Sequence, residues 1–383
     1  MPPLARFREL SLRVAVIFGT RPEAIKMAPV ALALRAAPDM DCRIWSTGQH
    51  RTMLDQVLGF FDLACDADLA VMKADQTLND LFSSVVAGVD ALIRADRPDI
   101  ILVHGDTTTA SAAAVAAFNN RVPVGHVEAG LRSGRMDQPW PEEFNRRLVD
   151  MVSTIMFAPT QGAKGNLLAE GVPEDRIHVT GNTVVDALLE AMQRIQPGSA
   201  IRAELDSRFA YIDATKPMIL VTGHRRESFG DGFVQICHAL RRLSERGDVE
   251  IVYPVHLNPN VQDPVRRLVG TASGVHLIDP VDYPSFVYLM SRASVILTDS
   301  GGVQEEAPTL GKPVLVMRNV TERPEAIAAG VAELVGADED MIVSRTAAAL
   351  MRAPSKPTIN PYGDGRASER IVEELKRAAD NLR

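Results

Sequence analysis

Short runs of apolar, mostly β-branched residues alternate along the chain with longer alanine-rich segments of helical periodicity. The expected strands lie at 12–18, 100–103, 123–127, 218–222, 250–254, 275–278, 295–298 and 313–317, and helices are expected at 22–36 and 107–118. Continuous Val/Ile/Leu runs between helices are typical of parallel strands buried on both faces. The pattern therefore predicts a doubly wound α/β architecture.

The number of expected strands is too large for one sheet of ordinary size, so we expect two Rossmann-like domains. The strand–helix rhythm breaks over 196–216, where Pro197-Gly198-Ser199 interrupts it, and restarts at Met218. We predict a first domain of residues 1–180 plus 366–383 and a second of 181–365. The tail from residue 367 carries one apolar helical face and is expected to return to the first domain. Residues 1–12 contain no apolar core segment and are expected to be a frayed extension, not a secretory signal.

Composition narrows the class of protein. The chain has 383 residues and a formal net charge of −8, which argues against a nucleic-acid partner. No stretch has the apolar length of a membrane span, so no membrane partner is expected. Cys42, Cys65 and Cys237 are scattered without ligand spacing, which favours a reducing, cytoplasmic location and no metal site. The motifs of nicotinamide-binding, P-loop, zinc-protease and α/β-hydrolase sites are absent, so no cofactor is expected.

Basic residues follow several of the expected strands. Arg21 and Lys26 come after the first strand, His224 follows the strand at 218–222, and Arg323 follows the last. Arg-Pro-Glu-Ala-Ile occurs at both 21–25 and 323–327, each time where a helix is expected to begin with proline. The carboxyl ends of parallel strands are where open α/β sheets bind ligands, so these cations predict a diphosphate site.

A glycine-containing turn gives the second anion signal. Ser300, Gly301 and Gly302 follow the strand at 295–298 and open a helix, where free N–H groups attract phosphate. The alternative is an ordinary tight turn with Ser300 as the N-cap. Glu306 in the following turn could accept ribose hydroxyls or simply suit the helix dipole. Gly311-Lys312 is interpreted as a helix C-cap, not a phosphate loop.

Carboxylates at strand ends form a third group. Asp106 follows the strand at 100–103, and its alternative role is that of an N-cap. Glu128 ends the strand at 123–127, a position where function is favoured over structure. Glu142 and Glu143 follow Pro141, and on pattern alone first-turn acidity explains them better than catalysis.

These residues stand in blocks that resemble the bacterial non-hydrolysing UDP-N-acetylglucosamine 2-epimerases. The blocks are FGTRPEAIKMAP (18–29), VHGDTTT (103–109), GHVEAGLR (125–132), PWPEE (139–143), GNT (181–183), TGHRRESF (222–229), YPVHLNP (253–259), TDSGG with QEE (298–306), ERPE (322–325) and NPYGDG (360–365). They cover nearly the whole chain after Leu12. The resemblance implies a glycosyltransferase-B-like fold, two Rossmann-like domains with a central cleft, and a homodimer.

The resemblance also implies roles for individual positions. The catalytic residues would be Asp106, Glu128, Glu142 and His224. The positions that match UDP-binding ones, with Phe286 at the uracil pocket, are Arg21, Lys26, Phe286, Ser300, Gly301, Gly302, Glu306 and Arg323. Gln49 and His256 match positions of an allosteric site for a second UDP-N-acetylglucosamine. The implied partners are therefore UDP-N-acetylglucosamine and UDP.

The implied reaction has to solve a problem of acidity. The hydrogen on carbon 2 of the sugar is not adjacent to a carbonyl, so simple proton removal is too slow. Elimination of UDP to 2-acetamidoglucal, followed by re-addition, avoids the problem without a cofactor. The alternatives are a hydrolysing epimerase, a retaining UDP-sugar glycosyltransferase and a catalytically dead nucleotide-sugar sensor. Which carboxylate is the base and which the acid stays open, and cell-surface polysaccharide synthesis is the expected use of the product.

Overall fold

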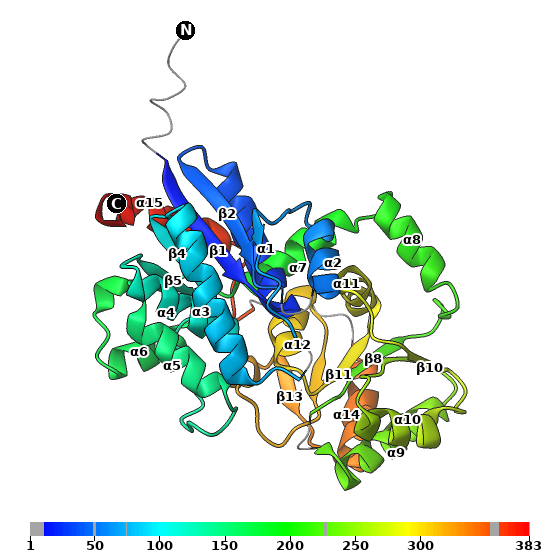
Figure 1. Ribbon diagram of the computed structural model, residues 1–383. Coiled ribbons are helices and arrows are strands. Elements are labelled where there is room, and N and C mark those ends of the chain that lie inside the picture. The colour runs from blue at the N-terminus through cyan, green and yellow to red at the C-terminus, as the bar shows by residue number, and fades with distance from the viewer. Residues whose placement is uncertain (1–10, 49–50, 74, 226–227, 353–359, 383) are drawn as a thin grey trace. The chain divides into compact units, whose positions relative to one another are not determined.

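The computed structural model describes residues 11–48, 51–73, 75–225, 228–352 and 360–382. The chain divides into two compact units (Figure 1), of which unit 1 comprises 1–187 with 362–383 and unit 2 comprises 188–361. Each unit contains one parallel sheet with helices in its connections. The predicted α/β class with two Rossmann-like halves, of glycosyltransferase-B-like type, is confirmed.

Unit 1 contains a seven-stranded sheet in the order β3-β2-β1-β4-β5-β6-β7, with every pair parallel. Its strands are β1 (Leu12–Phe18), β2 (Met40–Ser46), β3 (Ala67–Asp68), β4 (Ile100–His104), β5 (Val124–Val127), β6 (Ile155–Ala158) and β7 (Ile177–Val179). Its helices are α1 (Arg21–Ala36), α2 (Arg51–Phe60), α3 (Leu78–Ala95), α4 (Thr108–Asn119), α5 (Glu142–Val152), α6 (Gln161–Ala169), η1 (Glu174–Arg176), the start of α7 (Thr183–Arg194) and α15 (Ala367–Leu382).

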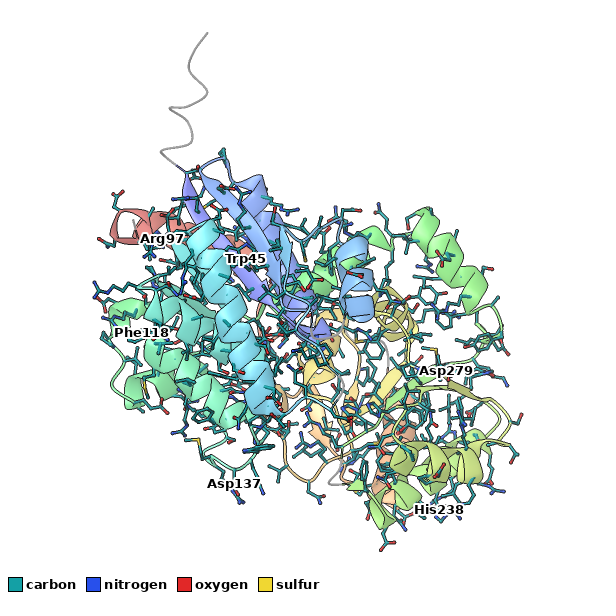
Figure 2. All side chains as sticks on the ribbon, in the orientation of Figure 1. Trp45, Arg97, Phe118, Asp137, His238 and Asp279 are labelled. Atoms are coloured by element: carbon teal, nitrogen blue, oxygen red, sulfur yellow. The ribbon has the colours of Figure 1, made fainter. Side chains whose placement is uncertain are left out.

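Helices α3, α4 and α5 pack side by side over one face of the unit 1 sheet. Residues of β1 alternate between the two faces, and Ala15 and Ile17 belong to the core beneath these helices. Trp45 of β2, labelled in Figure 2, lies in the same core and is 3% exposed. The alanines of α4 allow close packing, which brings the start of α4 and the end of β4 to a common edge.

Helix α15 packs against α1 in unit 1. Its first two amides, those of Ala367 and Ser368, donate to the carboxylate of Asp186 at 3.2 and 2.7 Å. Burial raises the pKa of Asp186, and the hydrogen bonds from these amides partly offset the rise. A residue 181 positions earlier in the chain therefore caps the C-terminal helix.

Unit 2 contains a six-stranded parallel sheet in the order β10-β9-β8-β11-β12-β13. Its strands are β8 (Met218–Thr222), β9 (Glu250–Pro254), β10 (Val275–Ile278), β11 (Val295–Thr298), β12 (Val314–Val316) and β13 (Ala332–Leu334). Its helices are α8 (Ala200–Arg208), α9 (Asp231–Ser244), α10 (Pro259–Val269), α11 (Tyr283–Arg292), α12 (Gly301–Glu306), η3 (Ala307–Leu310), α13 (Pro324–Ala328) and α14 (Glu339–Leu350), together with the end of α7. Central strands β8 and β11 are almost wholly apolar and buried on both faces, as the sequence predicts.

Three local expectations can be compared with the structure. Asp106 is not the N-cap of α4, because Thr107 holds that position and its hydroxyl accepts the Ala110 amide at 3.0 Å. Ser300 does stand at the N-cap of α12, but its side chain makes no capping hydrogen bond. Gly311 caps η3 in the left-handed conformation, with φ of 66°, which confirms the C-cap interpretation. None of the helices in the described ranges is long and apolar enough to cross a membrane.

Candidate active site

The turn between β1 and α1 is built around a buried carboxylate. Thr20 caps α1, and Glu23 accepts the amides of Gly19 and Thr20 at 3.0 and 2.8 Å. The other oxygen of Glu23 accepts the Thr107 hydroxyl at 2.6 Å. Burial raises the pKa of Glu23, and the hydrogen bond from Thr107 is the largest of those opposing the rise. The structure places Arg21, half-buried, as the first residue of α1 beside this turn.

Asp106 lies in the turn between β4 and α4. Its carboxylate pairs with the guanidinium of Arg146, and its carbonyl accepts the Asn145 amide at 2.9 Å. Both partners come from α5, where they are adjacent residues. The carboxylate is 28% exposed, whereas Arg146 is 11% exposed. Helix α5 therefore holds both the backbone and the charge of Asp106, with one carboxylate face still accessible.

Glu128 follows β5 directly and has an unusual backbone conformation, with φ of 70°. Non-glycine residues in this region carry strain that the surrounding structure must offset. Its carboxylate is 8% exposed and pairs with the ammonium of Lys26. The same oxygen accepts the Asn182 amide at 2.9 Å and lies 3.4 Å from Nε2 of His104. The turn thus directs Glu128 into a polar, nearly enclosed position against a fixed positive charge.

Glu142 is the first residue of α5, one helical turn before Arg146. Its Oε2 is buried and accepts no hydrogen bond from any described residue. Its neighbour Glu143 is fully buried and accepts the Ser133 amide at 3.0 Å and the Arg147 guanidinium at 2.9 Å. Burial raises the pKa of Glu143, but these partners more than offset the rise and hold it below its ordinary value. Glu143 therefore anchors the start of α5, and Glu142 has one oxygen whose hydrogen-bonding capacity the described residues do not use.

The three predicted carboxylates gather at the carboxyl edge of the unit 1 sheet. A Cβ added to Gly105 would lie 3.7 Å from Oε1 of Glu128, so Glu128 packs against the residue before Asp106. Glu142 and Arg146 share one face of α5, and Arg146 contacts Asp106. Positive groups, Lys26 and Arg146, are interleaved among the acids. No cluster with metal-ligand composition occurs in the described part of the chain.

In unit 2 the loop after β8 is tied to the turn after β11. The amides of His224 and Arg225 donate to one oxygen of the buried Asp299 at 2.6 and 2.7 Å. Nδ1 of His224 lies 3.2 Å from the other oxygen. Burial lowers the pKa of His224, Asp299 partly offsets this, and the neighbouring Arg225 and His256 lower the pKa further. Asp299 therefore holds the backbone of this loop and lies directly beside the imidazole of His224.

Arg323 lies beside the glycine turn at the start of α12. A Cβ added to Gly301 would be 3.7 Å from the guanidinium carbon. The Nε of Arg323 donates to Glu305 at 2.5 Å, and Glu305 is 1% exposed. A buried carboxylate thus orients the arginine against the backbone of Gly301. Both features that the sequence suggested for anion binding stand at one edge of the unit 2 sheet.

Glu306 and Phe286 are linked through α11. The hydroxyl of Tyr283 donates to Glu306 at 3.0 Å, and Glu306 is buried. Phe286 lies three residues after Tyr283 and therefore on the same side of α11, where it is half-buried. These contacts bring the two positions into one region of unit 2.

The two candidate allosteric positions differ in what the structure describes. The imidazole of His256 is exposed and stacks on that of His224, with ring centroids 5.6 Å apart and an interplanar angle of 21°. His256 therefore lies beside a residue implied to be catalytic. Gln49 lies outside the described residues, so its prediction is not compared with the structure.

Sequence reasoning missed several partners of the site residues. Arg146, Asn145 and Glu23 make buried contacts to the Asp106 turn but look like ordinary helix residues in the sequence. Asp299 stood in a matched block without an assigned role, although it ties His224 to the glycine turn. One signal could have identified three of these partners. Glu23, Asn145 and Asp299 are polar residues at buried positions, and buried polar residues need a partner.

Comparisons with known proteins identify the family of this chain. Residues 32–376 match the family described as UDP-N-acetylglucosamine 2-epimerase. A probable UDP-N-acetylglucosamine 2-epimerase of Ralstonia solanacearum is 52% identical over 369 residues, covering 95% of this chain and 98% of that protein. The UDP-N-acetylglucosamine 2-epimerase of Escherichia coli is 51% identical over 371 residues, with 95% and 98% covered. A crystal structure of the Neisseria meningitidis enzyme bound to UDP-GlcNAc has a TM-score of 0.88 and 45% identity, covering 96% of this chain and 100% of that one.

The two parallel α/β units have the glycosyltransferase-B-like fold, and the relatives that share it are enzymes of nucleotide sugars. Within that class, the chain belongs to the UDP-N-acetylglucosamine 2-epimerase family, and the resemblance seen in its motifs is confirmed. It is an enzyme of the isomerase class.

Proposed function

We propose that this enzyme reversibly converts UDP-N-acetylglucosamine to UDP-N-acetylmannosamine by eliminating UDP and adding it back. The observation that carries the proposal is the grouping of Asp106, Glu128 and Glu142 around Arg146 and Lys26 at one sheet edge. A related structure, 45% identical, was solved with UDP-GlcNAc bound. A glycosyl transfer reaction needs no base for carbon 2, whereas epimerisation requires acid/base groups there.

The proposed chemistry balances without a redox cofactor. A carboxylate takes the proton from carbon 2, and the electrons of that bond form a double bond between carbons 1 and 2. The bond from carbon 1 to the UDP oxygen breaks, and UDP leaves with its electron pair. Re-addition reverses these steps with a proton delivered to the opposite face, so two acid/base groups are needed unless the sugar turns over.

The contacts of the carboxylates suggest how the work is divided. Glu128 faces the Lys26 ammonium, an arrangement that suits a carboxylate acting as the base. Glu142 has a buried oxygen that accepts no hydrogen bond from the described residues, which suits a group whose hydrogen-bond partner is the sugar. We therefore propose Glu128 as a proton acceptor and Glu142 as the group that returns a proton, with Asp106 supporting both.

For UDP, the proposed contacts lie at the edge of the unit 2 sheet. Arg323, oriented by Glu305, and the amides of the Ser300–Gly302 turn would stabilise charge on the departing diphosphate. His224, held beside Asp299, would add a polar contact to the diphosphate. Phe286 and Glu306 would hold the uridine, and Arg21 would add a further cation.

Amide replacements test the proposal. We expect Asp106→Asn, Glu128→Gln and Glu142→Gln each to lower turnover on the order of a hundredfold or more while UDP still binds. Turnover would be followed by the ratio of the two epimers and UDP affinity by calorimetry. Glu174→Gln is the matched control, because Glu174 pairs with Lys164 on the surface of unit 1 and is 72% exposed. Full activity in all three amide variants would refute the assignment.

Product analysis separates the remaining alternatives. Incubation with UDP-N-acetylglucosamine and no acceptor should yield UDP-N-acetylmannosamine, with solvent deuterium at carbon 2 of both epimers. Release of free N-acetylmannosamine would indicate a hydrolysing epimerase, and turnover only with an added acceptor would indicate a retaining glycosyltransferase. We propose that the enzyme is cytoplasmic and that its product serves cell-surface polysaccharide synthesis.

We also propose a homodimer. Phe118 of α4, labelled in Figure 2, is 59% exposed, and Met151 of α5 is 81% exposed. Both line a hollow of about 640 Å³ on unit 1. Large apolar side chains gathered on a surface are typical of an interface. Light scattering should give the mass of a dimer for the native chain and of a monomer for Met151→Asp, and a monomeric native chain would overturn this proposal.

A further inference from the structure

His126, the last but one residue of β5, is fully buried and contacts two oxygen atoms. Its Nε2 lies 2.8 Å from the carbonyl of Gly105, and its Nδ1 lies 2.6 Å from Asp150. A carbonyl oxygen can only accept, so Nε2 donates to Gly105. Burial raises the pKa of Asp150, but its contacts with His126 and Arg132 outweigh burial and hold that pKa below its ordinary value. Asp150 is therefore a carboxylate, and Nδ1 donates to it.

The two contacts of His126 reach both turns that carry proposed catalytic carboxylates. Gly105 directly precedes Asp106, so the hydrogen bond fixes the peptide from which the Asp106 turn begins. The second oxygen of Asp150 accepts the amide of Gly130 at 3.3 Å, two residues after Glu128. The buried contact between His126 and Asp150 therefore links the Asp106 turn to the Glu128 turn.

Asp150 lies on the same helix as Glu142, the third proposed catalytic carboxylate. Glu142, Asn145, Arg146 and Asp150 occupy one face of α5, at spacings of three, four and eight residues. Asp150 is 4% exposed on its side chain and is paired at 2.7 Å with Arg132, which itself is 7% exposed. Asp150 therefore ties the C-terminal part of α5 to His126 and, through the Gly130 amide, to the Glu128 turn.

We infer that His126, held by Asp150, is a positioning residue that sets the Asp106 turn relative to Glu128 and Glu142 through its hydrogen bond to the Gly105 carbonyl. The inference rests on the proposed epimerase reaction. His126 has no contact with solvent or substrate in this role, because it is fully buried. Misplacing a reacting group by about 1 Å can lower turnover about a hundredfold, so its effect should fall on turnover.

Two amide replacements distinguish the contacts of His126. The amide nitrogen of Gln in His126→Gln can reach the place of Nε2 and keep the bond to Gly105. The amide nitrogen of Asn in His126→Asn takes the place of Nδ1, so it keeps the bond to Asp150 and loses Gly105. We expect His126→Asn to lower kcat about tenfold to a hundredfold with little change in KM, and His126→Gln to stay within about threefold of the native kcat.

UDP affinity shows whether the site in unit 2 is intact, and thermal unfolding shows whether each variant is folded. The groups proposed to hold UDP lie mainly in unit 2, so both variants should bind UDP as the native chain does. The matched control is His178→Asn, since His178 pairs with Glu374 at 3.1 Å elsewhere in unit 1 and should leave kcat unchanged. Equal kcat in His126→Asn and His126→Gln, or a defect in KM and UDP affinity instead of kcat, would overturn the inference.

Asp150→Asn gives a second route if a His126 variant does not fold. Asn keeps the size of Asp150 but has only one acceptor oxygen, so it cannot hold both His126 and the pair formed by the Gly130 amide and Arg132, which His126→Gln leaves in place. We expect a fall in kcat in the same direction as for His126→Asn, and native kcat in a folded Asp150→Asn would contradict the inference. A native chain without epimerase activity would refute the proposed function itself, and the positioning role with it.

Discussion

Replacing Lys26 with methionine removes the positive charge that faces the Glu128 carboxylate. The two side chains are only 12% and 8% exposed, so water cannot replace the lost partner. Removing one member of a buried pair costs about 3–5 kcal/mol. Because the Asn182 amide still donates to Glu128 at 2.9 Å, we expect the lower end, about 3 kcal/mol. For a unit of about 150–250 residues this corresponds to a fall in Tm of about 6–12 °C.

A double-mutant cycle tests this reasoning by thermal unfolding at pH 7. Lys26→Met with Glu128→Gln leaves neither charge, so the double variant should regain at least about 1 kcal/mol relative to Lys26→Met alone. The matched control is Lys376→Met, because Lys376 and Asp39 form an exposed pair at 2.9 Å, 39% and 49% exposed, that should contribute less than about 1 kcal/mol. If the double variant is as unstable as Lys26→Met, or if Lys26→Met resembles the control, charge pairing does not hold Glu128 in place.

Three further substitutions follow from contacts described above. Asp186→Ala leaves two amides at the start of α15 without their acceptor, so it should lower the free energy of unfolding in urea by about 1–2 kcal/mol. Asp186→Asn should lower it by less. Equal losses of unfolding free energy in the two variants would contradict a capping role. Burial raises the pKa of Glu322, but the hydrogen bond and charge of Arg318 outweigh burial and lower it to about 2. The Glu322 carboxylate therefore stabilises the fold above pH 4.5, and this stability is lost as the pH falls toward 2. Because Glu322 is 35% exposed, we expect Glu322→Gln to cost only about 1 kcal/mol at pH 7 and less at pH 4. A cost that is larger at pH 4 than at pH 7 would contradict this reasoning. Gly301→Ala should leave Tm unchanged, because the added Cβ would make only an ordinary contact with Arg323 at 3.7 Å. The same Cβ should weaken UDP binding about tenfold, because it would crowd the approach of a phosphate to the backbone. Unchanged UDP affinity would argue against a phosphate at this turn.

The strands could be predicted from sequence because buried parallel strands are written as uninterrupted apolar runs. The expected ranges at 12–18, 218–222, 250–254, 275–278 and 295–298 coincide with the observed strands. Parallel strands all end at the same edge, so the positions of Asp106, Glu128, Ser300 and Arg323 at sheet edges followed directly.

The partners of these residues could not be predicted in the same way. Asn182 lies 54 residues from Glu128 and Arg146 lies 40 from Asp106, and no local pattern specifies which side chains meet across such separations. From the sequence alone, the helical residue Arg146 cannot be distinguished from a solvent-exposed arginine, because its burial depends on how α5 packs. The left-handed backbone conformation of Glu128 could not be predicted either, because glycine is the residue that usually adopts a positive φ.

The shared face of α5 limits how the length of this helix can change. One residue inserted between Glu142 and Asp150 would turn everything after it by about 100° around the helix axis. The carboxylate at one end and the ion pair at the other would then no longer point the same way, whereas added residues before Glu142 would lengthen only a connection. Aligned chains that carry a gap inside this helix should therefore be suspected of having lost catalysis even when all three acids are retained.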